Sequence, residues 1–232
     1  DGHYVYPMIA QESLTYTNTQ FVKSAAKLSQ CPTDIEREVA FAGRSNAGKS
    51  SALNRLTGNK KLARTSKTPG RTQLINYFQI GERPLALVDL PGYGFAKVPL
   101  AVKNEWQKEL GNYLQKRDAL VGLVLLMDIR HPLKEFDTAM IDWAIKASMP
   151  VHILLTKADK LKRGPAQNTM LQVKKAMKPH GDLVTVQTFS SLSGDGIDVL
   201  KKRLNGWLLP APVAPAEDET GADDAQETDQ PE

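Results

Sequence analysis

An eight-residue run near the start of the chain has the composition of a phosphate-binding loop. It consists of Gly43, Arg44, Ser45, Asn46, Ala47, Gly48, Lys49 and Ser50, that is, glycine, four residues, then glycine, lysine and serine. Glycines let the backbone curl until consecutive N–H groups point at one anion. We expect Lys49 to reach the terminal phosphates of a nucleotide and the Ser50 hydroxyl to ligate Mg²⁺.

The segments on either side of this loop supply a strand and a helix. Residues 39–42 are apolar, and residues 48–57 are compatible with a helix that includes Ser51. Such a helix offers its free N–H groups and positive dipole end to the same phosphates. The alternative is a glycine-rich turn that binds nothing. The order of strand, loop and helix disfavours it, and we include Ser51 among the nucleotide contacts.

A carboxylate and a glycine follow a second apolar strand. Residues 85–88 are apolar, and Asp89, Leu90, Pro91 and Gly92 come directly after them. A carboxylate at a strand end can hold Mg²⁺ through water, and a glycine N–H can contact the terminal phosphate. Such a tetrapeptide is common by itself. It becomes specific here because it follows the phosphate-binding loop and a polar segment, residues 59–72, that holds five basic residues and no acidic one.

A third strand end carries groups suited to reading a base. Thr156, Lys157 and Asp159 follow the apolar residues 151–155. The two carboxylate oxygens of Asp159 match the pair of N–H donors on the Watson–Crick edge of guanine, which adenine lacks. The stem of Lys157 can pack over the base plane. The alternative is a strand-end loop with ordinary charges.

A weaker signal for base recognition comes after the last strand. Ser190, Ser191 and Leu192 follow residues 183–189, and their backbone could contact the guanine oxygen. His131, at another strand end, is expected to be a hydrogen-bonded loop residue rather than a general base.

Composition narrows the class of protein. The 232 residues, 41% of them hydrophobic, suffice for one full core. Cys31 is the single cysteine, so no disulfide partner exists, and a reducing cytoplasm is expected. No apolar run approaches the roughly 20 residues of a membrane span.

Charge is distributed unevenly along the chain. Residues 217–232 hold eight acidic residues and no basic one. Removing those eight from the 26 acidic residues leaves 18 against 30 basic residues, a net charge of +12 for the rest. A basic body with an acidic tail indicates a polyanionic partner such as RNA, although a merely solvated basic surface remains the alternative.

The hydrophobic pattern predicts an α/β fold. Six strands are expected at 39–42, 73–80, 85–88, 121–127, 151–155 and 183–189, with helices at 48–57, around 106–114, and at 136–147, 166–177 and 197–207. Alternating strands and helices imply a mostly parallel sheet with helices on both faces, and the turn at 81–84 makes one edge antiparallel. A short helix is also expected at 21–28.

The same pattern sets the expected domain limits. Residues 1–15 form an N-terminal extension; residues 1–7 precede Met8, and we treat them as partly a remnant of cloning. We expect residues 16–209 to form one domain that carries these motifs, and residues 210–232 to be an acidic, disordered tail.

Together these motifs resemble the translation-factor-type GTPases with a Ras-like domain. Three stretches narrow the match, namely residues 68–73 (Thr-Pro-Gly-Arg-Thr-Gln), 89–98 (Asp-Leu-Pro-Gly-Tyr-Gly-Phe-Ala-Lys-Val) and 128–132 (Asp-Ile-Arg-His-Pro). Over roughly residues 21–208 the chain is similar to the EngB family of bacterial GTPases, one of the TrmE-Era-EngA-EngB-Septin-like groups.

This resemblance implies a six-stranded Ras-like sheet, binding of GTP and GDP with Mg²⁺, and slow GTP hydrolysis. It further implies a role in assembly of the large ribosomal subunit through its rRNA, a need for the protein in normal cell division, and a cytoplasmic monomer. Lys49, Thr72 and Gly92 are the catalytic candidates. Gly70, Arg71 and Thr72 belong to the first switch, with Thr72 as its Mg²⁺ ligand and Thr68 as the competing candidate.

Three positions qualify the resemblance. Tyr93 stands where Ras-type GTPases place a water-orienting glutamine, so intrinsic hydrolysis should be slow. Thr156 stands where most GTPases have asparagine, which leaves guanine choice mainly to Asp159. Asn46 occupies the position where related GTPases hold K⁺; the alternative is that it only caps the loop.

Two other functions remain as alternatives. A P-loop nucleotide kinase lacks support because no arginine-rich lid segment is evident. A non-catalytic rRNA-binding protein that keeps a nucleotide for structure would bind RNA regardless of nucleotide.

Overall fold

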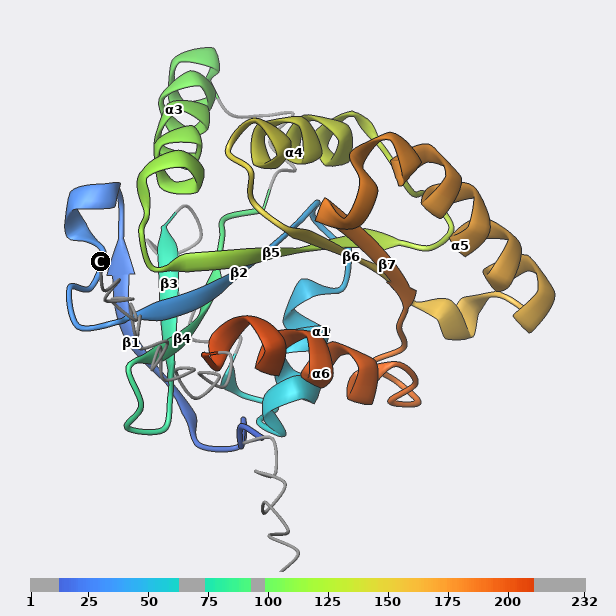
Figure 1. Cartoon of the computed structure of the whole chain (residues 1–232), viewed down its shortest axis with the longest axis horizontal. Coiled ribbons are helices and arrows are strands. Elements are labelled where there is room, and N and C mark those ends of the chain that lie inside the picture. The colour runs from blue at the N-terminus through green and yellow to red at the C-terminus, as the bar shows by residue number, and fades with distance from the viewer. Residues whose placement is uncertain (1–12, 63–73, 93–98, 211–232) are drawn as a thin grey trace, which may run out of the picture.

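The computed structural model describes residues 13–62, 74–92 and 99–210 (Figure 1). Most of the predicted first switch, including Thr68, Gly70, Arg71 and Thr72, lies outside these ranges, as do Tyr93 and the acidic tail. Within the described ranges, no helix is long and apolar enough to cross a membrane.

A seven-stranded sheet forms the centre of the protein, in the order β1-β3-β4-β2-β5-β6-β7. The strands are β1 (Thr19–Ala25), β2 (Arg37–Gly43), β3 (Ile75–Ile80), β4 (Leu85–Asp89), β5 (Leu120–Asp128), β6 (Val151–Thr156) and β7 (Val184–Thr188). Strand β3 is antiparallel to both its neighbours. The other five strands after it in the sheet, β4, β2, β5, β6 and β7, are parallel to one another. The predicted fold class is confirmed, with seven strands in place of six.

The additional strand is β1, and the helix predicted at residues 21–28 is wrong. Residues from Thr19 to Ala25 pair with β3 along the edge of the sheet, and only a three-residue 3₁₀-helix, Leu28–Gln30, follows. Val22 is 46% exposed, so β1 lacks the apolar pattern that marks the inner strands. Pairing with a neighbouring strand overrides the weak helical spacing.

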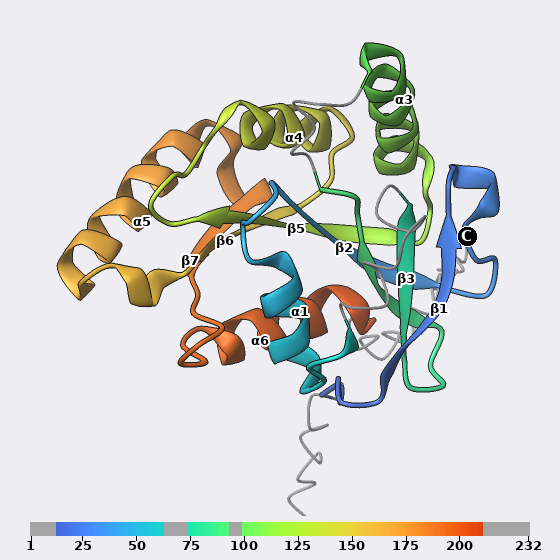
Figure 2. The same cartoon turned by 180° about the vertical axis from the view of Figure 1, so that it is seen from behind.

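Five helices of the described residues cover the two faces of the sheet (Figures 1 and 2). Helices α3 (Leu100–Lys116), α4 (Glu135–Lys146) and α5 (Arg163–Met177) share one hydrophobic core with the sheet. Helices α1 (Lys49–Thr57) and α6 (Ile197–Leu208) share a second core on the opposite face. Helices on both faces therefore agree with the prediction.

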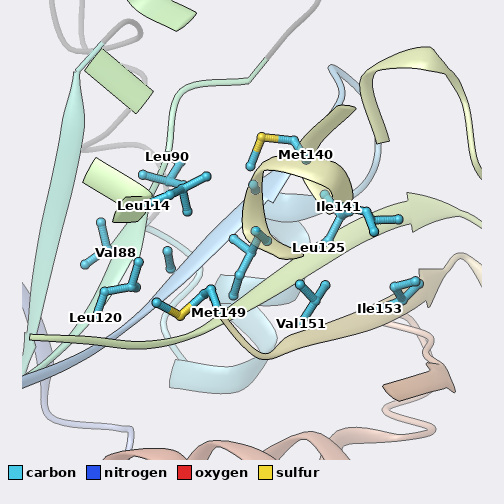
Figure 3. Packing of buried hydrophobic residues seen from close by; sticks show 14 of the residues in the cluster. Val88, Leu90, Leu114, Leu120, Leu125, Met140, Ile141, Met149, Val151 and Ile153 are labelled. Carbon is cyan, nitrogen blue, oxygen red and sulfur yellow. The ribbon is translucent and has the colours of Figure 1, made fainter. Parts of the chain in front are cut away.

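Coverage on both sides explains why the inner strands are almost uninterrupted apolar runs. Met140 and Ile141 of α4 pack over Leu125 of β5 and Val151 of β6 (Figure 3), and all four are at most 2% exposed. Burying one such side chain contributes about 1.5–3 kcal/mol. On the other face Gly122 of β5 makes room for the indole of Trp207, which a Cβ at this position would overlap.

The topology gathers the predicted motifs at one edge of the sheet. Strands β2, β4, β6 and β7 are parallel, so their carboxyl ends lie on the same side. The chain continues from β2 toward β4 on one side and reaches β5 on the other, which makes β2 the switch point of the sheet. Ligands of open α/β sheets bind at such a point.

Candidate nucleotide-binding site

The predicted phosphate-binding loop connects the end of β2 to the start of α1. Asn46 and Gly48 have left-handed backbone conformations, with φ of 67° and 85°. These two residues curl the loop, and Gly48 is also the N-cap of α1. Gly48 has no side chain with which to cap the helix, and no other described residue caps it, so the first N–H groups of α1 remain available to a ligand. Strand, loop and helix have the geometry that binds phosphates.

The segment after β4 packs directly against this loop. Lys49 forms an ion pair with Asp89 and donates a hydrogen bond to the carbonyl of Leu90. A Cβ at Gly92 would lie 3.4 Å from the carbonyl oxygen of Gly43, an ordinary van der Waals distance, so the backbone of Gly92 lies next to the loop. The structure thus brings Lys49, Asp89 and Gly92, three of the predicted site residues, together at the loop.

These residues also fit a hydrated Mg²⁺ ion. Asp89 is 7% exposed, and its Oδ1 accepts no hydrogen bond from the described residues beyond its ion pair with Lys49. A buried carboxylate oxygen with spare acceptor capacity can receive a hydrogen bond from metal-bound water. Ser50 lies in the first turn of α1 and supplies a hydroxyl from the loop itself.

Residues at the end of β6 form hydrogen bonds with the phosphate-binding loop. The hydroxyl of Thr156, 2% exposed, contacts the carbonyl of Ala47 and lies 3.1 Å from that of Met127. Lys157 Nζ donates to the carbonyl of Asn46 at 2.7 Å. The hydroxyl of Thr156 is thus engaged with the phosphate-binding loop and the end of β5.

Asp159 and Ser190 meet across the ends of β6 and β7. Asp159 is exposed in a short 3₁₀-helix, Ala158–Lys160, and its Oδ1 accepts a hydrogen bond of 2.8 Å from Ser190 Oγ. Ser190 is 1% exposed, and its Oγ also accepts the N–H of Ser193 at 3.2 Å. Ser190 therefore orients the carboxylate, a role that the sequence did not reveal.

These groups surround a cavity of about 740 Å³. Its walls include the predicted residues Gly48, Ser51, Thr156, Lys157, Asp159, Ser191 and Leu192. They also include Asn54, Arg55, Gly58, Lys60 and Lys160, which the sequence analysis missed. Asn54 and Arg55 could have been found, because they lie three and four residues after Ser51 on one helical face. The volume is within the usual range for a cofactor site.

Asp128, at the end of β5, is another residue to which the sequence analysis assigned no role. Hydrogen bonds from Arg130, one of them 2.8 Å long, lower the pKa of its carboxyl to about 2. The charged carboxylate lies 3.6 Å from Lys157 Nζ. Asp128 thus helps to hold Lys157 against the phosphate-binding loop. Its position at the end of an apolar strand was the one feature of the sequence that could have indicated this role.

A smaller cavity of about 210 Å³ lies on the other side of the loop, lined by Arg44, His131 and Asp137 among others. Asp137 of α4 is 1% exposed. Its Oδ2 accepts the N–H of Lys134 at 3.0 Å, and its Oδ1 has no partner among the described residues. Burial raises the pKa of this carboxyl to about 6.

This buried carboxylate leads to a prediction about stability and pH. Since the folded pKa is above the ordinary value, the charge costs stability as pH rises from about 4 through 6. Asp137→Asn keeps the acceptor for Lys134 and removes the charge. We expect it to stabilise the protein at pH 7.5 by about 2 kcal/mol and to be neutral below pH 4. Urea unfolding at several pH values measures this; a gain that is independent of pH would contradict the assigned cause.

Comparison with known proteins places these features in context. A family model described as "50S ribosome-binding GTPase" matches residues 38–157, which include the loop, Asp89 and Lys157. A protein named "Probable GTP-binding protein EngB" from Vibrio vulnificus is 57% identical over 211 residues, covering 91% of this chain and 97% of its own. A protein of the same name from Vibrio parahaemolyticus is 59% identical over 196 residues, covering 84% and 89%.

A solved structure gives the same result at the level of the fold. The crystal structure of a probable GTP-binding protein engB is similar with a TM-score of 0.59 and 24% identity, and the match covers 72% of this chain and 96% of that one.

Proposed function

Because this chain belongs to the EngB family of GTP-binding proteins, we propose that it is a GTP-dependent switch in assembly of the large ribosomal subunit. The observation that carries this proposal is the convergence of three motifs around the phosphate-binding loop. Gly48 of the loop lines the cavity together with Lys157 and Asp159, and Asp89 pairs with Lys49 of the loop.

The roles of the individual residues follow from this arrangement. Lys49 and the N–H groups of the loop bind the phosphates, and Asp159 reads guanine. Ser50 and Asp89 hold Mg²⁺, which would neutralise phosphate charge when bound. Thr72, with Thr68 as the competitor, is the proposed further ligand, and both lie outside the described residues. Hydrolysis is proposed to be slow, since Tyr93 follows Gly92 in the sequence.

The proposed partner is the rRNA of the large subunit. Its support is the charge of +12 outside residues 217–232 and the description of the family as 50S ribosome-binding. In this proposal GTP orders the basic segment 59–72, and hydrolysis releases it. The place of action is the cytoplasm, the protein is a monomer, and loss of the protein impairs cell division.

Sedimentation with large ribosomal subunits tests the proposal. The protein should cosediment with the subunit in a non-hydrolysable GTP analogue and less so in GDP. Binding through phosphates should also weaken steeply with salt, because counterions are released. Binding that ignores the nucleotide favours the non-catalytic RNA-binding alternative. Transfer of phosphate to a nucleoside monophosphate favours the kinase alternative.

A second prediction concerns K⁺. Asn46 is exposed in the loop, and its left-handed backbone suits asparagine or glycine. If its side-chain oxygen holds K⁺, the GTPase rate should rise with K⁺ but not with Na⁺ at equal ionic strength. Asn46→Gly keeps the backbone conformation and removes the side-chain oxygen. We expect this variant to reduce the GTPase rate in K⁺ about tenfold, which corresponds to about 1.4 kcal/mol in activation free energy. A rate indifferent to the cation would leave Asn46 with a structural role.

A further inference from the structure

A chain of buried polar groups runs from β6 to the loop that follows β7. We call residues 189–196 the base loop, because Ser190 at its start orients Asp159 at 2.8 Å. His152 of β6 is 3% exposed and lies in register with Thr185 of β7. Gln187, two residues further along β7, is 6% exposed. Neither His152 nor Gln187 lines the cavity, and the proposed function uses neither of them.

The hydrogen bonds of Gln187 determine the orientation of its amide. Gln187 Nε2 lies 2.9 Å from the carbonyl oxygen of Gly196 and 3.1 Å from that of Thr188. Only the nitrogen of the amide can face two carbonyl oxygens, because it carries two hydrogens. Gln187 Oε1 therefore faces His152 Nε2 at 2.7 Å and accepts a hydrogen bond from the N–H group of the ring.

This orientation in turn determines the tautomer of His152. With Nε2 as donor, the neutral ring has Nδ1 as acceptor, and Thr185 Oγ1, 2.7 Å away, donates to it. Burial lowers the pKa of His152 to about 4, so the ring is neutral at physiological pH. All polar atoms of the two buried side chains are thereby used. Such a fully satisfied network fixes one geometry.

The network ends on the residues that close the base loop. Gly196 is the N-cap of α6 with φ of 88°, and a Cβ there would lie 2.8 Å from Gln187 Nε2. The neighbouring Asp195 carbonyl accepts the N–H of Ser190 at 3.0 Å. The hydrogen bond from Gln187 thus fixes the position of Gly196 and, through the chain, of the neighbouring Asp195. The Asp195 carbonyl fixes the backbone of Ser190, and the Ser190 hydroxyl orients the carboxylate of Asp159.

We propose that Gln187, held by His152, is a positioning residue that sets guanine specificity through the base loop. The proposal rests on the proposed reading of guanine by Asp159. Without the amide donor to Gly196, the far end of the base loop loses its hydrogen bond to Gln187 of β7, and Ser190 no longer fixes the Asp159 carboxylate. A purely structural residue would affect all nucleotides alike, whereas a positioning residue affects the contact to the base.

Binding of GDP and inosine diphosphate separates the two roles. Inosine lacks the 2-amino group of guanine. The dissociation constant of inosine diphosphate divided by that of GDP therefore reports the contact with Asp159. Gln187→Glu keeps the shape and an acceptor for His152 but cannot donate to the carbonyls. Gln187→Met keeps the length alone. We expect either variant to reduce the ratio about fivefold or more, as for loss of one hydrogen bond.

Two further variants make the outcome decisive. Tyr16→Phe removes a 2.7 Å hydrogen bond to Asn205 in the distal half of α6 and should leave the ratio unchanged. Asp159→Asn must collapse the ratio; if it does not, the proposed reading of guanine itself fails. If Asp159→Asn behaves as expected but both Gln187 variants keep the ratio of the unmodified chain, the positioning role is overturned. Failure of both Gln187 variants to fold, judged by thermal melting, would assign Gln187 to the stability of the sheet instead.

Discussion

Replacing Asp159 with asparagine is expected to weaken GDP binding by about 3–5 kcal/mol, roughly a factor of 10² to 10⁴. In the proposed complex the carboxylate would accept both N–H donors of guanine, whereas an amide could accept only one and would place its own N–H group against the other. Xanthine presents an acceptor at that position, so the variant should prefer xanthosine diphosphate. Titration calorimetry with GDP and with xanthosine diphosphate measures the two affinities and thereby the change in preference.

Neighbouring residues provide matched controls for this variant. Asp195→Asn makes the same chemical change on an exposed residue of the base loop whose side chain does not line the cavity, and it should leave both affinities unchanged. Ser190→Ala removes the 2.8 Å bond that orients Asp159 and should cost about 1–3 kcal/mol without creating a preference for xanthine. Equal GDP affinity of Asp159→Asn and the unmodified chain would remove Asp159 from the site.

The parts of this site that sequence patterns predicted are those in which residue type fixes the role. Gly48 and Lys49 have few uses at that spacing other than in a phosphate-binding loop. Asp89 ends an apolar strand, and Asp159 follows one by three residues. Ser190, Asp128 and Gln187 were different. Their roles depend on which strands are neighbours, and a serine, aspartate or glutamine carries no sign of its partner in the sequence.

The same distinction explains the fold. Strand β5 was evident because both its faces are covered and its sequence is therefore apolar throughout. Strand β1 was missed because it pairs with only one neighbour and exposes Val22 and Lys23. Long-range pairing supplies the stability of such a strand, and local propensity does not encode it.

The end of the sheet opposite the candidate site contains a buried ionic network. Glu38, at the start of β2, is 0% exposed. Its Oε1 accepts hydrogen bonds from Arg117 Nε at 2.8 Å and Nη2 at 2.7 Å. Its Oε2 accepts the hydroxyls of Tyr77 at 2.8 Å and Tyr113 at 2.6 Å. Arg117 also donates to the Pro32 carbonyl at 2.8 Å, so one guanidinium joins three segments.

Arg117→Ala is expected to destabilise the protein by about 3–5 kcal/mol, because it leaves the Glu38 carboxylate buried without its counter-charge. Urea unfolding in nucleotide-free buffer is the appropriate measurement, since a bound ligand would add its own stabilisation. Arg130→Ala is the control, because Arg130 pairs with Asp128 at 2.8 Å but its side chain is 40% exposed. This exposed pair should contribute less than about 1 kcal/mol.

A double variant identifies the cause of the loss. Glu38→Gln in the Arg117→Ala background removes the buried charge and keeps an acceptor for the two tyrosine hydroxyls. It should therefore recover part of the lost stability, although the single change Glu38→Gln is itself destabilising when Arg117 is present. If the double variant is less stable than Arg117→Ala, the contact of the Arg117 guanidinium with the Tyr77 ring, whose centroid lies 5.6 Å from Cζ, is the main contribution and the unpaired charge is not.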